Sequence, residues 1–259
     1  MSGEASTVHF VGAGPGAEDL ITLRGIKLLE KADVVVYAGS LVNPALLKYC
    51  PHAEIHNSAK MTLDEVIEVI RKACEQEKSV VRLHTGDPSI YGAIKEQMDA
   101  LDELKIRYDS CPGVSACFGA ASSLNMEFTL PDVSQSLIIT RMAGKTAVPP
   151  LESIKSFAAH QSTMAVYLSA SHLDELADEL IAGGYRESTP VAIVYKATWP
   201  EEKKFICTIA TMAAIARENN ISKTAMIIVG DTVNNSGYSK SRLYADDFST
   251  EFREAKKQI

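Results

Sequence analysis

LHTGDPSIYGAIKEQ, from Leu83 to Gln97, is the stretch of sequence that decides the fold class of this chain. Residues 80–84 form a short, mainly apolar run that predicts a buried strand. The strand ends in a Thr-Gly-Asp-Pro turn, and an amphipathic helix is expected to begin near Ile90. Strand, turn and helix in this order are typical of α/β proteins, whose ligands lie at the carboxyl ends of the strands.

The turn itself supports two interpretations. Gly86 allows the backbone to come close to a ligand, and the carboxylate of Asp87 could accept hydrogen bonds from a ribose diol. Gly, Asp and Pro are also the residues that dominate ordinary turns. A small-molecule site and a turn with no further role are therefore both compatible with these residues taken alone.

Composition and charge narrow the class of protein. The 259 residues suit one large domain or two ordinary ones, and 46% hydrophobic with 23% charged residues is usual for a soluble protein. The net charge of -7 argues against a protein that binds the nucleic acid backbone. No secretion signal or membrane span is recognisable, so we expect a cytoplasmic protein.

Neither a disulfide framework nor a metal site is expected. The five cysteines include no Cys-x-x-Cys pair, which argues against a structural zinc site. His52 and His56 are four residues apart, but Pro51 precedes them and no helix is evident there to place both on one face. The cysteines are interpreted as reduced, mostly structural thiols.

Alternating strands and helices predict a mainly parallel sheet in the first half of the chain. Strands are expected at 8–11, 33–37, 80–84 and 106–108, and helices at 20–31, 63–74 and 116–124. Thr62 is expected to cap the helix 63–74, with Glu65 three residues later completing a capping box.

The segment 128–133 interrupts the alternation of strands and helices and is expected to be a hinge. After it, strands are predicted at 137–140, 164–168, 191–195, 204–208 and 225–229, with a helix at 173–182 that stops at two glycines. The short connection between residues 195 and 204 predicts an antiparallel pair and a mixed sheet. We therefore expect two α/β domains, 1–128 and 133–245, followed by a charged tail, 246–259, that forms a surface helix or a loose end.

Several familiar chemistries are excluded by the motifs. Gly12-x-Gly14-x-x-Ala17 fits the dinucleotide fingerprint, but Ala38 stands where the ribose-binding acid belongs, and Asp33 lies at the opposite end of that strand. Pro15 also removes one N–H that could serve a pyrophosphate. Because no nucleophile elbow, phosphate loop or His-Glu-x-x-His motif is present, a cofactor is expected to bring the reactive group.

The chain resembles the tetrapyrrole methylases, two-domain enzymes that methylate corrin and sirohaem precursors with S-adenosylmethionine. The stretches that carry the resemblance are GAGPG at 12–16, DLITLRG at 19–25, TGDP at 85–88 and PGVSA at 112–116. YAGSLV at 37–42, ITR at 139–141, GKT at 144–146 and ATWP at 197–200 resemble the branch that methylates precorrin-4 or cobalt-precorrin-4 at carbon 11. The resemblance extends over nearly the whole chain.

This resemblance implies a site for S-adenosylmethionine in a cleft between the two domains, and a homodimer. The positions that match the family's cofactor contacts are Pro15, Thr85, Gly86, Asp87, Ile90, Ser115, Ala116, Leu168 and Ala197. Two of them depart from the family pattern, which commonly has Met at the position of Leu168 and Gly at that of Ala197.

The resemblance also implies a polyacidic tetrapyrrole substrate. Candidate substrate contacts are Ser40, Lys60, Met61, Thr62, Arg141 and Lys145. Arginine suits carboxylates because its guanidinium group can donate two parallel hydrogen bonds. Each of these cations could equally be a solvated surface charge, and Trp199 could be a core or hinge residue. The uroporphyrinogen-methylating relatives have an Asp near the position of Ala38. This chain has Ala38-Gly39-Ser40 there, so the acid/base role of that Asp cannot be transferred, and no catalytic residue is assigned.

Two other functions remain open from the sequence. A methylase of the same scaffold could act on another acceptor, such as another precorrin, RNA or a protein side chain. A non-catalytic module could bind the nucleotide cofactor and transfer nothing. The sequence also leaves open whether the natural substrate carries cobalt.

Overall fold

The computed structural model describes residues 7–256, so the first six residues and the last three residues of the expected tail lie outside the description. The chain divides into two compact units. One comprises Met1–Ser123 and Tyr195–Lys203, and the other comprises Leu124–Val194 and Lys204–Ile259. The segment Tyr195–Lys203 thus belongs to the first unit, although its neighbours in the sequence belong to the second.

The first unit contains a five-stranded sheet with the strand order β3-β2-β4-β1-β5. All of its strand pairs are parallel, as the sequence predicted. The strands are β1 (Thr7–Gly12), β2 (Val34–Tyr37), β3 (Glu54–Asn57), β4 (Val80–His84) and β5 (Arg107–Cys111). The helices are α1 (Leu23–Lys31), α2 (Leu63–Glu75), α3 (Ile94–Glu103) and α4 (Ala116–Leu124), with short 3-10 turns η1 (Glu18–Leu20), η2 (Pro44–Tyr49) and η3 (Ser58–Lys60).

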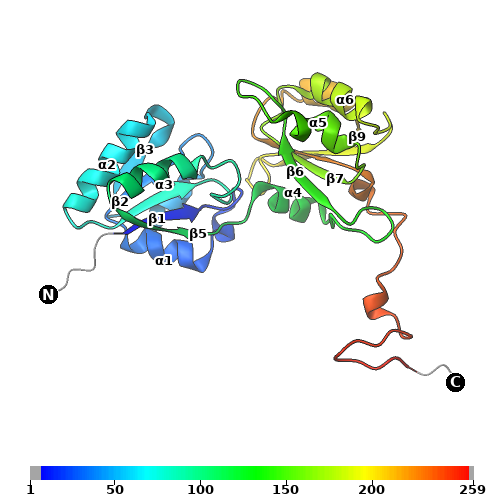
Figure 1. Cartoon of the computed structure of the whole chain (residues 1–259), viewed down its shortest axis with the longest axis horizontal. Helices are drawn as coiled ribbons and strands as arrows, with labels where there is room; N and C mark the ends of the chain where they lie inside the picture. Colours follow the sequence, from blue (N-terminus) through cyan, green and yellow to red (C-terminus); the bar gives the residue numbers. More distant parts are fainter. Residues whose placement is uncertain (1–6, 257–259) are drawn as a thin grey trace. The chain divides into compact units, whose positions relative to one another are not determined.

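Helices cover both faces of this sheet (Figure 1). On one face, α2 and α3 bury Ile70 and Leu101 against Phe10 of β1. On the other face, α1 buries Leu29 against Leu83 of β4. The central strands are therefore enclosed on both sides, which is usual for parallel sheets and leaves their carboxyl ends as the accessible positions.

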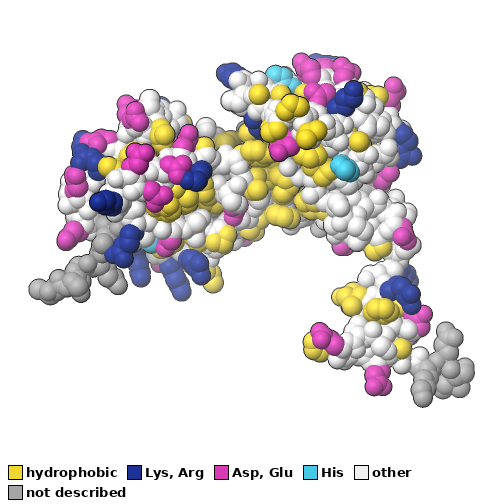
Figure 2. Space-filling view, in the orientation of Figure 1, with side chains coloured by type: hydrophobic (Ala, Val, Ile, Leu, Met, Phe, Trp, Pro, Cys, Tyr) yellow, Lys and Arg dark blue, Asp and Glu magenta, His cyan; other side chains and the backbone are white. Residues whose placement is uncertain are grey.

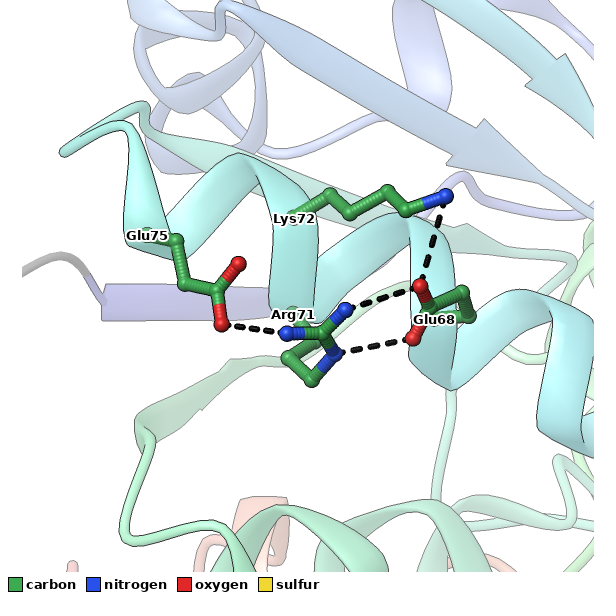
Figure 3. A network of polar contacts seen from close by, with 4 residues as sticks. All are labelled: Glu68, Arg71, Lys72 and Glu75. Atoms are coloured by element: carbon green, nitrogen blue, oxygen red, sulfur yellow. Dashed lines mark hydrogen bonds and ion pairs between the residues drawn. The ribbon is translucent and has the colours of Figure 1, made fainter.

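Helix α2 shows how the sequence pattern translates into the fold. Thr62 caps it and Glu65 completes the capping box, as predicted. Its outer face carries a ladder of ion pairs, in which Arg71 donates to both carboxylate oxygens of Glu68 at 2.8 Å and also contacts Glu75 (Figure 3). The hydrogen bonds from Arg71 lower the pKa of Glu68 to about 2. These charges neutralise one another at the helix surface, so they support α2 and not a ligand.

The second unit contains a mixed five-stranded sheet with the order β6-β7-β10-β8-β9, which confirms the mixed sheet expected there. β6 pairs with β7 in parallel, and β10 pairs with β7 antiparallel. The strands are β6 (Leu137–Arg141), β7 (Thr163–Tyr167), β8 (Pro190–Tyr195), β9 (Lys203–Thr208) and β10 (Ala225–Val229). The remaining elements are α5 (Ile154–Ala158), α6 (Leu173–Ala182), α7 (Met212–Glu218), η4 (Pro150–Glu152), η5 (Asp231–Asn234) and η6 (Arg242–Tyr244).

The helix expected near Ile90 begins only at Ile94. Tyr91 and Ala93 have φ angles of 55° and 50°, in the left-handed region that a right-handed helix cannot include. Gly92 between them lies so close to Pro88 that an added Cβ would be 2.1 Å from its carbonyl oxygen. The residues after Asp87 therefore form a tight irregular turn in place of the first helical turn.

The expected charged tail contains no helix within residues 246–256, the part that the structure describes. Arg253 organises this part, because its guanidinium group donates to the carbonyl oxygens of Leu243, Ala245 and Phe248. Between residues 7 and 256, no helix is both long enough and apolar enough to span a membrane.

Candidate functional site

The loops that follow β1 and β4 are joined backbone to backbone at the carboxyl edge of the first sheet. Gly14 and Gly86 exchange two hydrogen bonds. The nitrogen-to-oxygen distance is 2.8 Å where the Gly86 N–H donates to Gly14 and 3.2 Å where the Gly14 N–H donates to Gly86. The N–H of Ala13 donates to the carbonyl oxygen of His84 at 2.7 Å. Residues from two distant parts of the sequence, GAGPG and TGDP, therefore form one continuous surface.

A third loop, after β5, packs against the first two through glycine. A Cβ added to Gly113 would lie 2.1 Å from the carbonyl oxygen of Gly86, and one added to Gly12 would lie 2.6 Å from the Cα of Gly113. Neither position has room for a side chain. Gly86 has more space but needs glycine for another reason, because its φ of 58° is left-handed.

Asp87 ties these loops together with its side chain. Its Oδ2 accepts a hydrogen bond from the N–H of Gly113 at 2.9 Å, and its Oδ1 accepts from the N–H of Ser89 at 2.9 Å and from the Ser89 hydroxyl at 2.5 Å. Partial burial works against ionisation, but the hydrogen bonds from Ser89 and Gly113 outweigh it and lower the pKa of Asp87. Asp87 therefore forms a turn, as one interpretation expected, and also clamps the β5 loop. A carboxylate accepts about four hydrogen bonds, so acceptor capacity remains for a ligand.

The turn around Pro15 is held by the segment Tyr195–Lys203. The indole Nε1 of Trp199 donates to the Pro15 carbonyl oxygen at 3.0 Å, and the Thr198 hydroxyl accepts from the N–H of Ala17 at 3.0 Å. A Cβ on Gly16 would be 2.0 Å from the indole ring. Trp199, which the sequence left as a core or hinge residue, thus covers the turn after β1.

Most of the cofactor positions expected from the resemblance lie in this first unit. Thr85 is half-buried directly after β4, and the N–H of Ile90 donates to the carbonyl oxygen of Asp87 at 3.2 Å. Ser115 is buried just before Ala116 begins α4, and Ala197 is buried beside Thr198. The structure thus gathers Pro15, Thr85, Gly86, Asp87, Ile90, Ser115, Ala116 and Ala197 in one unit, and their role in binding stays a prediction.

Leu168 differs from these positions because it belongs to the second unit. It follows β7 immediately and has a left-handed φ of 54°. Its side chain is 67% exposed, which is unusual for leucine. Its expected contact with a cofactor also stays a prediction.

Four of the expected substrate contacts lie at the ends of β2 and β3. The two loops touch, because a Cβ on Gly39 would meet the Asn57 side chain at 2.1 Å and the Ser58 hydroxyl donates to the Tyr37 carbonyl at 3.1 Å. Ser40 and Lys60 are exposed and Met61 is half-buried. The Thr62 hydroxyl, in contrast, accepts from the N–H of Glu65 and caps α2.

Arg141 and Lys145 lie in the loop after β6, in the second unit. The Arg141 guanidinium group donates to the carbonyl oxygens of Met142 and Ala147 at 2.9 Å and of Thr146 at 3.2 Å. Arg141 therefore closes its own loop, and Lys145 is exposed within that loop. The contacts of both side chains with a substrate stay predictions.

Neither His84 nor Asp33 offers a catalytic base to these loops. His84 ends β4, but its Nε2 is buried and has no hydrogen-bond partner among residues 7–256. Burial, and then the charge of Arg82, lower the pKa of His84 to about 3, so it is neutral and enclosed at pH 7. Asp33 lies at the far end of β2, where it accepts a hydrogen bond from the N–H of Ser79 at 2.8 Å. Within the described chain, no three His, Cys, Asp or Glu side chains are arranged to bind a metal.

The structure adds supporting residues that the sequence analysis did not single out. Gly12 and Gly113 lie inside recognised motifs, but their steric role depends on the neighbouring loop. Glu202 accepts from the Thr198 N–H at 2.6 Å and from the Ser123 hydroxyl at 2.5 Å. The sequence signal for this supporting role was an acidic residue two positions after the ATWP stretch.

The chain is similar in sequence and in structure to known proteins. A family model described as Tetrapyrrole (Corrin/Porphyrin) Methylases matches residues 7–213. A protein of Methanocaldococcus jannaschii named cobalt-precorrin-4 C(11)-methyltransferase is 52% identical, over 97% of this chain and 98% of its own length. A solved cobalamin biosynthetic enzyme, cobalt precorrin-4 methyltransferase, is 42% identical with a TM-score of 0.87, covering 90% of this chain and 98% of that one.

A more distant structure shares the fold. Uroporphyrin-III C-methyl transferase from Thermus thermophilus, complexed with S-adenosyl homocysteine, has a TM-score of 0.74 at 23% identity. The match covers 91% of this chain and 97% of that one.

Replacing Gly113 with alanine is expected to destabilise the protein by about 1–3 kcal/mol, because the new methyl group must displace the backbone of Gly86. Urea unfolding followed by circular dichroism measures this loss. Gly144→Ala is the matched control, since nothing lies within 4 Å of an added Cβ there, and its stability should change by less than about 0.5 kcal/mol. Equal midpoints for Gly113→Ala and the unchanged protein would contradict the close approach of the loops.

Asp87→Asn is expected to cost about 1–3 kcal/mol of stability at pH 7, because one of the N–H groups that the carboxylate satisfies loses its acceptor. The folded-state pKa of Asp87 lies below the usual 3.8, so the stabilisation is present above that pH and is lost as the pH falls through the lowered pKa. The difference between the two proteins should therefore shrink in acid.

Urea midpoints measured from pH 7 down to pH 3 check this, with Asp178→Asn on the exposed face of α6 as the control. A stability difference that stayed constant over this pH range would show that the Asp87 charge makes no contribution.

Proposed function

The chain belongs to the tetrapyrrole (corrin/porphyrin) methylase family, and we propose that it methylates cobalt-precorrin-4 at carbon 11, with S-adenosylmethionine as the methyl donor, in cobalamin biosynthesis. The observation that carries the proposal is the 52% identity to a cobalt-precorrin-4 C(11)-methyltransferase over almost the full length of both chains. All the loops described above fall within that shared length. The cobalt form of the substrate is proposed because that relative's name specifies it.

The residues at the carboxyl edge of the first sheet fit a nucleoside cofactor. Asp87 has acceptor capacity left after binding Ser89 and Gly113, which suits ribose hydroxyl groups. Gly12 and Gly113 let the three loops pack closely together, and Ile90, half-buried beyond Asp87, is proposed to add an apolar contact. When bound, S-adenosylmethionine supplies an activated methyl group. We propose that Leu168 of the second unit also contacts it.

The protein contributes mainly orientation in this proposal. The three loops are fixed to one another by the backbone hydrogen bonds of Gly14 and by the bond from the Gly113 N–H to the Asp87 carboxylate. A fixed site holds the two reacting groups at the right separation. Their translational and rotational entropy is then lost on binding and not during the reaction, which can lower the barrier by several kcal/mol. Because His84 is buried and neutral, it is given no part in proton transfer in this proposal, which leaves the reactive group to the cofactor.

Exposed cations are proposed to hold the carboxylates of the tetrapyrrole. Lys60 extends from the β3 loop, and Lys145 extends from the loop that Arg141 closes. Acidic and basic side chains are interspersed on the visible face of both units, so recognition is assigned to these few positions and not to the general field (Figure 2). A homodimer, expected from the family resemblance, and a cytoplasmic location, expected because no secretion signal or membrane span is recognisable, belong to the same proposal.

The methyl transfer itself is tested by mass spectrometry. The protein is incubated with S-adenosylmethionine and either precorrin-4 or cobalt-precorrin-4, and the tetrapyrrole is expected to gain one methyl group at carbon 11, faster with the cobalt form. Gain of a methyl group by RNA or a protein, with none on either tetrapyrrole, would contradict the proposed acceptor. Binding of S-adenosylhomocysteine without transfer to any acceptor would indicate a non-catalytic module.

Lys145→Ala is expected to raise KM for the tetrapyrrole about two- to fivefold, which is the range for an exposed ion pair. The effect should weaken at high salt, because exposed charges are screened. Steady-state kinetics at two ionic strengths measure it, with Lys155→Ala on the exposed face of α5 as the control. If both lysine variants behave alike, Lys145 is only a surface charge.

A further inference from the structure

Trp199 is the only tryptophan of the chain, and it lies on the turn that contains Pro15. Its Nε1 donates to the Pro15 carbonyl oxygen at 3.0 Å, and its ring occupies the space beside Gly16. The ammonium group of Lys196 lies 5.2 Å from the centre of the indole ring. The indole is therefore fixed on one side by the turn and covered on another by a cation.

The turn needs such support because of its composition. Gly14 has a left-handed φ of 80°, and Gly16 follows Pro15, so both flanks of the proline can adopt many conformations in the absence of contacts. Pro15 restricts its own φ but has no N–H with which to anchor itself. On its other side, Pro15 packs against α4, where a Cβ on Gly119 would come within 2.8 Å of the proline ring.

The segment that carries Trp199 is itself held in a costly conformation. Thr198 has a left-handed φ of 69°, which is unfavourable for a β-branched residue. Its hydroxyl accepts from Ala17, its N–H donates to Glu202, and Glu202 also accepts from the Ser123 hydroxyl. Strain of this kind persists only where surrounding contacts fix it, and here the same contacts fix the position of the indole.

We propose that Trp199 is a positioning residue for the methyl donor, and that its fluorescence reports cofactor binding. Its hydrogen bond orients the Pro15 peptide and thereby preforms the turn next to which the cofactor binds. A preformed turn loses less conformational freedom on binding, so the indole N–H raises affinity without contacting the cofactor. This inference rests on the proposed function, because it assumes that S-adenosylmethionine binds at this turn.

The direct test compares Trp199→Phe with the unchanged protein. Phenylalanine keeps an aromatic ring beside Gly16 but has no N–H for the Pro15 carbonyl. Isothermal titration with S-adenosylhomocysteine is expected to show a Kd about fivefold higher, the effect of one lost neutral hydrogen bond. Thr198→Val removes the hydroxyl that accepts from Ala17 and should raise the Kd similarly.

Thr211→Val is the matched control for the loss of a threonine hydroxyl. Thr211 accepts from the N–H of Thr208 at 3.0 Å in the second unit, so its removal should leave the Kd unchanged. Steady-state kinetics separate positioning from mere folding support. Trp199→Phe should raise KM for S-adenosylmethionine, with KM for the tetrapyrrole unaffected, whereas a structural role would lower the active fraction and leave both KM values unchanged.

The single tryptophan also gives a readout that needs no substrate. Emission of the unchanged protein should shift as S-adenosylhomocysteine is added, with the same Kd as calorimetry gives. Equal Kd values for the unchanged protein and Trp199→Phe would overturn the positioning role, and calorimetric binding with constant emission would overturn the use of Trp199 as a reporter of binding. Failure of methyl transfer with normal S-adenosylhomocysteine binding would count against the acceptor alone, whereas no binding by the unchanged protein would overturn both proposals.

Discussion

The close approach of backbone at Gly12, Gly86 and Gly113 is the constraint on which the candidate site depends. The strand order places β1 between β4 and β5, so the loops after these strands meet at one edge of the sheet. A side chain at Gly12 or Gly113 would overlap the neighbouring backbone. Because the glycines let the loops touch, residues that are far apart in the sequence form a single rigid surface.

Several polar side chains of the two units have a structural role of their own. Asp87 binds the Gly113 N–H, Arg141 closes its own loop through three carbonyl oxygens, and Thr62 caps α2. In each case a side chain that suggests ligand binding satisfies backbone groups. The site is therefore shaped by backbone, which agrees with a reaction in which the cofactor carries the reactive group and the protein fixes positions.

Periodicity predicted most of the strands, because buried parallel strands are short apolar runs. β3 escaped prediction because it is an exposed edge strand, and its sequence, EIHN, has no apolar run. The late start of α3 has no signal either, since Tyr91 and Ala93 are left-handed although neither is glycine. Motif resemblance indicated the loops of the candidate site, but the contact between Trp199 and Pro15, 184 residues apart, is visible only in the fold.

The ATWP stretch at 197–200 supports the turn that follows β1, although the two are distant in the sequence. Ala197 is buried, where a larger side chain would need new space, and Thr198 and Trp199 both bind the turn after β1. That turn is the GAGPG signature itself. Two stretches that are far apart in the sequence therefore form one supported turn, and the geometry beside Pro15 depends on both of them.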